Sequence, residues 1–376
     1  MWAVQVTHYA GNGVFALSAA VDVLIAWAFV AWAARTHPTR PRLAVGVVLA
    51  FVALALKGVL LLKLGVELHF GVMHVLWLDF VIVLPLAAAL LGLLAWRAGG
   101  AAVRTLVVLG LLAAPVGAYA SFVEPNRLVV ERATVELPAA RAGHDPIHVA
   151  VLSDIQFEHV GDHEREAVAR LMAQRPDVIL LTGDYHQGSR AQFARERPAI
   201  RRLFARLRAP GGVFAVQGDV EGPGDTRRTF AGTGIRTLFD ETARTRVGDR
   251  ELTIGGVQLA YWRPAARTFT RRFERLRGTR DVRILVAHRP DEVLGLRPQT
   301  RVDLVAAGHT HGGQVQLPLL GVLQSGSRVP GEVAAGGLHV LDGRTIYVSR
   351  GVGVERGQAP RLRSGAPPEI SLLELR

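Results

Sequence analysis

Long apolar stretches fill the first third of the chain, and their lengths predict helices that cross a membrane. The four stretches are residues 13–34, 43–64, 74–96 and 103–122. Each is close to the ~20 residues that a helix needs to cross about 30 Å of hydrocarbon. The first stretch has no basic start and similar stretches follow it, so we do not expect a cleaved signal peptide. The pattern predicts an all-α membrane bundle of four transmembrane helices in residues 1–123.

Arginine placement predicts the orientation of this bundle, because cytoplasmic loops have an excess of Lys and Arg. The arginines lie between the first and second stretches and between the third and fourth, at Arg35, Arg40, Arg42, Arg97 and Arg104. We therefore expect a multi-pass protein of the inner or plasma membrane. Everything after residue 122 is expected in the periplasm or at the cell exterior.

Three ionisable residues, Asp22, Lys57 and Asp79, interrupt the apolar stretches. A helical rise of 1.5 Å per residue places all of them in the outer half of the membrane, where they can pair with one another. Two interpretations stay open. Either Lys57 extends toward the surface and the group serves helix packing only, or the group belongs to a path for a substrate or an ion.

A different pattern begins after residue 123. Glu124-Pro125 ends the fourth stretch, and residues 124–146 are predicted to be a linker and a leading strand. From 147 to 376, short apolar runs alternate with Arg-rich helical segments, which is typical of an α/β domain. The predicted strands are 147–152, 178–181, 213–216, 282–287, 304–307, 339–341, 346–348 and 370–375, and the predicted helices lie near 162–174 and 190–207.

Composition narrows the chemistry that this domain can perform. The chain has 376 residues, of which 49% are apolar and none is cysteine, and its net charge is +12. The lack of cysteine excludes disulfide partners, an iron–sulfur cluster and a thiol nucleophile. Any metal must therefore be held by His, Asp, Glu, Asn or Gln. The positive excess after residue 123 is modest and has no aromatic residues interleaved with it, so we expect no nucleic-acid partner.

Acidic and imidazole side chains follow five of the apolar runs. These side chains are Asp154, Asp184, Asp219, His288, His309 and His311. In open α/β sheets, the carboxyl ends of the strands form the crevice in which ligands bind. Several neighbouring carboxylates are costly to bury unless a cation neutralises them. The pattern therefore predicts a metal cluster at this edge of the sheet.

The order and the residues of these motifs resemble those of the calcineurin-like metallophosphoesterases, in particular of their membrane-associated bacterial branch. The family pattern is D-x-H, G-D, G-N-H-D/E, a strand-end His and then G-H-x-H. Its most specific piece in this chain is GHTHGGQ at 308–314. The resemblance runs from about residue 147 to 375, and it implies a four-layer αββα sandwich that hydrolyses a phosphoester bond.

Carried over position by position, the resemblance implies two divalent metal ions, which would be Mn, Fe or Zn. One ion would be held by Asp154, Gln156, Asp184 and His311, and the other by Asp184, Asp219, His288 and His309. The resemblance assigns catalytic roles to Asp184, Asp219 and His309. It also implies in-line attack on phosphorus by a metal-bridging hydroxide, without a covalent enzyme intermediate.

The chain departs from the family pattern at three positions. Gln156 stands where the family has His, and Asp219 and Val220 stand where it has Asn and His. Gln156 can ligate through its amide oxygen. Val220 has no proton to give to a leaving group, so we expect a substrate whose leaving group is already good. Three histidines lie nearby in the sequence, His159, His163 and His186. Each is either a substitute for the missing histidine or an ordinary surface residue.

Two functions from different classes stay open. The first is a membrane-anchored, metal-dependent hydrolase of a phosphodiester or pyrophosphate, with a lipid or lipid-linked substrate. The alternative is a catalytically weakened domain that binds a metal or a phosphorylated ligand and regulates, or is served by, the membrane bundle. The Arg-rich segments either hold the domain against anionic membrane lipids or form a solvated face. The chain has no P-loop Lys and no G-x-S-x-G turn, which excludes those two classes of enzyme.

Overall fold

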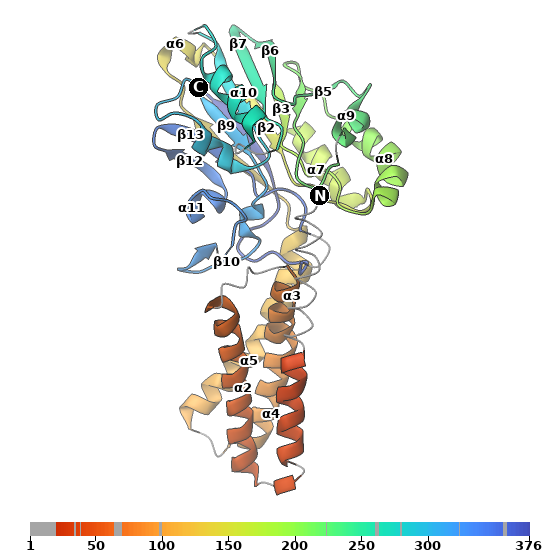
Figure 1. The fold of residues 1–376 in the computed structure, drawn as a ribbon, viewed down its shortest axis with the longest axis vertical. Coiled ribbons are helices and arrows are strands. Elements are labelled where there is room, and N and C mark those ends of the chain that lie inside the picture. The colour runs from red at the N-terminus through yellow and green to blue at the C-terminus, as the bar shows by residue number, and fades with distance from the viewer. Residues whose placement is uncertain are drawn as a thin grey trace. The chain divides into compact units, whose positions relative to one another are not determined.

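The computed structural model describes residues 20–33, 35–37, 39–63, 70–97, 100–222, 224–259, 263–278, 280–322, 324–355 and 359–376 (Figure 1). The chain divides into two compact units. The first consists of residues 1–123 and 356–361, and the second consists of residues 124–355 and 362–376. All of the motif residues therefore belong to the second unit.

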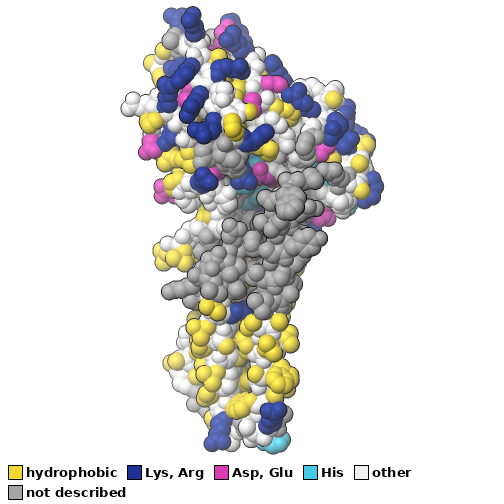
Figure 2. All heavy atoms as spheres, viewed as in Figure 1, with side chains coloured by type: hydrophobic (Ala, Val, Ile, Leu, Met, Phe, Trp, Pro, Cys, Tyr) yellow, Lys and Arg dark blue, Asp and Glu magenta, His cyan; other side chains and the backbone are white. Residues whose placement is uncertain are grey.

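The first unit is helical. Its elements are α2 (Arg40–Lys63), α3 (Phe70–Leu78), α4 (Leu84–Ala95) and α5 (Ala101–Ala118). A π-helical segment, η1 (Asp79–Val83), joins α3 to α4, while α5 continues through η2 (Tyr119–Val123). The 3-10 turn η3 (Glu124–Asn126) follows directly and starts the second unit. Many large apolar side chains of this unit are exposed, Leu93 by 82% and Leu49 by 62%, and Figure 2 shows them in yellow.

The predicted bundle of four transmembrane helices is wrong. Within the described residues, only Met73–Ala95 and Ala101–Asn126 are long and apolar enough to cross a membrane. The described part of a further apolar helix, Ala20–Ala33, has fewer residues than these two helices. α2, which has Lys57 in its interior, is not among the two either. Residues 13–19, 34 and 64 of the predicted stretches lie outside the described residues.

The three ionisable residues of the apolar stretches do pair. Lys57 Nζ donates to Asp79 Oδ2 at 2.5 Å and also to Asp22 Oδ1. The Lys57 side chain is only 7% exposed, so it does not extend toward a surface. The three residues come from α2, η1 and the helix Ala20–Ala33, so the ion pairs connect separate helices. This favours a role in helix packing, but without the extension of Lys57 toward the surface that was expected with it.

The second unit is an α/β sandwich with two six-stranded mixed sheets. The strands of the first sheet are, in spatial order, β1 (Val129–Val135), β14 (Glu369–Leu375), β2 (Ile147–Leu152), β3 (Val178–Leu181), β4 (Val213–Ala215) and β5 (Ile235–Thr237). Those of the second are β12 (Gly337–Leu341), β13 (Arg344–Val348), β9 (Leu304–Ala307), β8 (Val282–Val286), β7 (Arg250–Gly256) and β6 (Glu241–Val247). Strands β2 to β5 are mutually parallel, as are β7, β8, β9 and β13.

Short helices complete the second unit. They are α6 (Ala139–Ala142), α7 (Asp162–Ala173), α8 (Arg190–Phe204), α9 (Asp225–Phe230), α10 (Pro264–Glu274), η4 (Pro290–Gly295), η5 (His311–Gly313) and α11 (Gly331–Ala334). A capping box starts α8, because Ser189 Oγ accepts from Gln192 N at 3.2 Å and Gln192 Oε1 accepts from Ser189 N at 2.7 Å. A small hairpin pairs β10 (Gln316–Leu317) with β11 (Gly321–Val322).

The core of the second unit lies in three clusters. One lies between the two sheets and contains Val149, Leu180 and Ile284. The other two cover the outer faces, where α7 and α8 pack on the first sheet and α10 and η4 pack on the second. The predicted strands are all present, with bounds that agree to within two residues. The loops at the carboxyl ends of the parallel strands are thereby held by two packed sheets.

Candidate metal centre

The loops that follow five strands place the six predicted acids and histidines together. Asp154, Asp184 and Asp219 follow β2, β3 and β4 of the first sheet, while His288 and the pair His309 and His311 follow β8 and β9 of the second. Two groups have ligand atoms within 4.8 Å of one another: Asp154 with Asp184 and His288, and Asp219 with His288 and His309. Residues up to 157 positions apart in the sequence thus meet at one edge of the sandwich.

Backbone geometry turns these side chains toward one another. Five of the predicted ligands adopt the left-handed region, with φ of 47° at Asp154, 40° at Gln156, 54° at Asp184, 72° at His309 and 51° at His311. This conformation is uncommon for residues other than glycine and costs about 1 to 3 kcal/mol each. Such strain persists only where the surrounding fold enforces it, and it clusters at functional sites.

Two motif glycines allow the loops to approach closely. A Cβ at Gly218 would lie 2.1 Å from Asp184 Oδ1, and a Cβ at Gly308 would lie 2.2 Å from Asp154 Oδ2. Any side chain at these positions would displace a carboxylate of the centre. The glycines of the G-D-V-E and G-H-T-H segments are therefore needed for the positions of the carboxylates next to them.

The half of the centre around Asp154 is buried. Asp154 accepts from the backbone N–H of His309 at 3.0 Å, and its Oδ1 lies 3.8 Å from His311 Nε2. Burial raises the pKa of the Asp154 carboxyl to about 6. Asp184 accepts from Val220 N and from Gln156 Nε2, each at 3.0 Å. Gln156 thus turns its amide nitrogen toward Asp184, and the same nitrogen donates to Glu355 at 3.4 Å.

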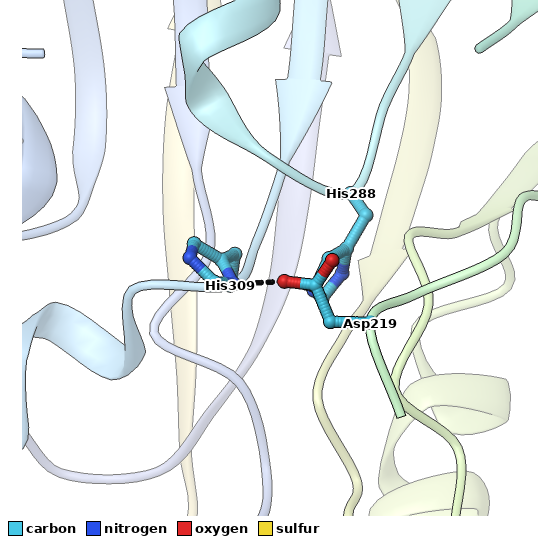
Figure 3. A group of neighbouring side chains, drawn as sticks. All are labelled: Asp219, His288 and His309. Carbon is cyan, nitrogen blue, oxygen red and sulfur yellow. Dashed lines mark ion pairs between the residues drawn. The ribbon is translucent and has the colours of Figure 1, made fainter. Parts of the chain in front are cut away.

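The half around Asp219 is more open (Figure 3). Asp219 Oδ2 lies 3.2 Å from His309 Nδ1 and 3.7 Å from His288 Nε2. His288 Nδ1 donates to the Thr182 carbonyl at 2.9 Å, and His309 Nε2 donates to the Gly326 carbonyl at 3.2 Å. Because the outer nitrogen of each ring donates to a carbonyl, His288 Nε2 and His309 Nδ1 are the nitrogens that face the carboxylates, as in histidines that bind metals.

The donor set fits divalent cations. Within the described residues, the buried Nε2 atoms of His288 and His311 have no hydrogen-bond partner. Burial lowers the pKa of His288, but the charges of Asp184, Asp219 and Asp154 outweigh it and raise that pKa well above its usual value. A proton on His288 thus offsets the negative charge of the carboxylates. A bound cation can offset the same charge in place of this proton.

Glu221 is part of the centre, although the sequence analysis did not assign it a role. Its buried carboxylate accepts from the backbone N–H groups of Tyr185 and Gly218, each at 2.7 Å, and of Asp184 at 3.2 Å. Burial, and then the charge of Asp184, raise the pKa of Glu221 to about 8. Through these hydrogen bonds, Glu221 connects the loop after β4 to the loop after β3. The sequence feature that could have identified Glu221 is the final acidic position of the G-N-H-D/E pattern.

The candidate substitutes for the missing histidine are engaged elsewhere. His159 Nδ1 lies 3.0 Å from Glu196, His163 Nε2 lies 3.2 Å from the Val352 carbonyl, and His186 Nε2 lies 3.2 Å from the Glu158 carbonyl. Half-buried Val220 contributes its backbone N–H to Asp184. A cationic side chain instead lies next to Asp219: Arg289 Nε donates to Asp219 Oδ1 at 3.2 Å and Arg289 Nη2 donates to Oδ2 at 2.5 Å.

Replacing Arg289 by glutamine is expected to tighten metal binding at the Asp219 half about 5- to 10-fold. The guanidinium competes with a cation for the Asp219 oxygens, and a partly exposed ion pair of this kind contributes about 1 kcal/mol. Competition with a fluorescent chelator, measured on the full chain in detergent, gives the metal affinity. Arg246→Gln, which removes an exposed arginine paired with Glu251, is the matched control. Unchanged or weaker metal binding in Arg289→Gln would contradict the expectation.

Comparison with known proteins defines the class to which this centre belongs. Residues 147–313 match the family described as calcineurin-like phosphoesterase. The chain therefore contains a calcineurin-like metallophosphoesterase domain, a hydrolase domain that acts on phosphoester bonds. This finding confirms the family and the enzyme class that the motifs predicted, and the family implies divalent metal ions.

Three relatives are similar to the chain over most of their own length. Phosphodiesterase YaeI of Escherichia coli is 28% identical over 61% of this chain and 82% of that protein. Metallophosphoesterase YkuE of Bacillus subtilis is 27% identical over 69% and 89%. UDP-2,3-diacylglucosamine pyrophosphatase LpxG of Chlamydia trachomatis is 26% identical over 70% and 94%. The names of the first and third describe hydrolysis of a phosphodiester and of a pyrophosphate.

Proposed function

We propose that the chain hydrolyses a phosphodiester or pyrophosphate bond in a metal-dependent reaction. The observation that supports this proposal most strongly is the meeting of three carboxylates and two imidazoles from five strand ends, with ligand atoms in two groups no wider than 4.8 Å. His311 Nε2 lies 3.8 Å from Asp154 Oδ1, next to one of these groups. In such a centre, bound divalent cations stabilise charge on phosphoryl oxygens and supply a nucleophile from water at neutral pH.

The residues divide into two proposed ligand sets that share Asp184. Asp154, Gln156, Asp184 and His311 would hold one cation, and Asp184, Asp219, His288 and His309 would hold the other. The carbonyls of Thr182 and Gly326 orient His288 and His309, and Glu221 positions the backbone of Asp184. His309 and Asp219, with side chains 15% and 29% exposed, are accessible to a substrate, so we assign them and Asp184 the catalytic roles.

Two features of the chain support a proposal for the class of substrate: the lack of a proton donor at Val220 and the two long apolar helices. Val220 cannot protonate a leaving group, and a pyrophosphate or activated diester depends least on such help. We propose that Met73–Ala95 and Ala101–Asn126 anchor the chain in a membrane. Arg97 in the connection between them and Arg104 in the first turn of the second helix favour cytoplasmic placement of this connection, which would put the phosphoesterase domain on the outer side. There the substrate would be a lipid or a lipid-linked phosphate.

Hydrolysis of bis-p-nitrophenyl phosphate by the full chain in detergent tests the proposal. We expect turnover with added Mn²⁺, Zn²⁺ or Mg²⁺, loss of turnover with a chelator, and a fall of about 10²-fold in His309→Ala, which removes one ligand. The control is His144→Ala, because the His144 side chain is 92% exposed and lies outside the centre.

A non-catalytic domain that binds a metal or a phosphorylated ligand is the second candidate, and Val220 is the observation that favours it. The same assay separates the two. A chain that binds metal but hydrolyses diester, pyrophosphate and lipid substrates no faster than His309→Ala would be a binding domain.

A further inference from the structure

The hairpin β10–β11 presents leucines to solvent. Residues 317–320, here called the leucine turn, contain Leu317, Leu319 and Leu320, which are 37%, 106% and 72% exposed. Among the described residues of the second unit, the one other large apolar side chain with comparable exposure is Val340 at 70%. Single exposed apolar residues are normal on a protein surface, but a group of them marks an interaction site.

The leucine turn has a defined backbone conformation. Leu320 N donates to the Leu317 carbonyl at 3.2 Å and closes the turn. Leu319 has φ of 69°, a left-handed conformation that is strained for a leucine. The fold therefore holds Leu319 outward at an energetic cost, although an aspartate or asparagine would suit both the conformation and the exposure better.

The leucine turn is also connected to the metal centre. Gln316, at its base, donates from Nε2 to the Gly312 carbonyl at 3.1 Å and from N to the Ser364 carbonyl at 2.8 Å. Val322, on the other strand, is so close to Gly313 that a Cβ there would lie 2.4 Å from Val322 Cγ1. Because Gly312 and Gly313 follow His311 directly, whatever binds the turn is held at a fixed position relative to the centre.

We propose that the leucine turn inserts into the surface of the lipid bilayer that anchors the chain, an inference that rests on the membrane anchoring proposed above. Only two residues, 127 and 128, separate the end of the helix Ala101–Asn126 from the start of β1 at Val129, so the anchoring bilayer is a permanent neighbour of the domain. Residues 315–327 contain no ionisable side chain, which suits contact with hydrocarbon. One turn is also too small for a stable protein interface, which buries about 800 Å² on each partner.

Insertion of the leucine turn would hold the metal centre at the level of the lipid headgroups. A phosphoryl group attached to a lipid would then reach the centre without leaving the bilayer. A soluble phosphoester would gain nothing from the insertion. The turn would thus select for membrane-borne substrates, and it would do so without contacting the phosphoryl group itself.

Single-site labelling tests this inference, since the chain contains no cysteine. Leu319→Cys, Val340→Cys and Leu109→Cys are labelled with an environment-sensitive fluorophore in the full chain, reconstituted in phosphatidylcholine–phosphatidylglycerol nanodiscs. Val340 is the matched exposed apolar position, and Leu109, 60% exposed on α5, reports the proposed span. We expect brominated lipid to quench the labels at 319 and 109 at least about threefold more than the label at 340, and aqueous iodide to quench mainly the label at 340.

Each other outcome has a defined meaning. Quenching of the label at 319 by iodide, with the label at 109 quenched by brominated lipid, would overturn the insertion and leave the anchoring in place. Quenching of the label at 109 by iodide would overturn the anchoring. Protection of the label at 319 from both quenchers would indicate a protein partner and also overturn the insertion. Unchanged hydrolysis of bis-p-nitrophenyl phosphate verifies that the labelled variants are folded.

Discussion

Replacing Asp184 by asparagine is expected to lower kcat/KM for bis-p-nitrophenyl phosphate by about 10³-fold or more and to reduce the bound metal. Asp184 is 3% exposed and lies 3.4 Å from His288 Nε2 through its Oδ2. It is the carboxylate that both proposed ligand sets share. The substitution keeps the size of the side chain but removes its charge, so both cations lose part of their neutralisation.

Turnover and metal content, measured on the same preparation of Asp184→Asn, separate this explanation from misfolding. We expect an unchanged circular dichroism spectrum with less than two metal ions per chain by elemental analysis. Asp162→Asn is the matched control, because the Asp162 side chain is fully exposed at the start of α7. Retention of both the full rate and the metal content in Asp184→Asn would show that Asp184 does not bridge the cations.

The strands that contribute to the centre could be predicted because each contains a continuous run of apolar residues, which indicates a buried strand. Val178–Leu181 and Leu304–Ala307 are wholly buried, and continuous apolar runs of this kind are typical of central parallel strands. β5, β6 and β7 were not predicted. β6 is an edge strand with the sequence ETARTRV and an exposed face, so its polar residues hide the alternation that identifies strands.

The number of membrane-crossing helices could not be predicted from apolar length alone. The predicted stretch at 43–64 lies in α2 (Arg40–Lys63), which is not among the two described helices that are long and apolar enough to cross a membrane. Helix ends depend on local hydrogen bonding and tertiary contacts, which hydropathy does not contain. The pairing of Lys57 with Asp22 and Asp79 was expected from the sequence, although these partners are 35 and 22 residues away, because the helical rise places all three residues in the same half of the membrane.

The predicted ligand residues lie together, whereas the groups that support them were largely missed. Arg289 follows a strand-end histidine and nothing in its neighbourhood of the sequence indicates that it pairs with Asp219, 70 residues away. Thr182 and Gly326 orient histidines through backbone carbonyls, which any residue type can provide. Residue types therefore identify ligands, but the residues that orient them emerge from the fold.

Glu292, outside the centre, is expected to make the stability of the second unit depend on pH. Glu292 is 1% exposed in η4 and accepts from Thr270 Oγ1. Burial raises its pKa to about 7, with a further rise from Asp240 and Asp291. Between the usual glutamate value of 4.5 and about 7, the folded chain keeps a proton that the unfolded chain has lost. The free energy of unfolding therefore falls as pH rises through this window.

Replacing Glu292 by glutamine should remove this loss, because glutamine keeps the shape of the protonated carboxyl group and does not ionise. At pH 8 we expect the variant to be more stable than the unmodified chain by about 2 kcal/mol, or roughly 5 °C in Tm, with little difference at pH 5. Thermal unfolding with a chelator present, at both pH values, isolates this effect from metal binding. Glu332→Gln, at an exposed glutamate of α11, should behave like the unmodified chain. Equal losses of Tm between pH 5 and pH 8 in the unmodified chain and in Glu292→Gln would show that Glu292 is already ionised in the folded protein.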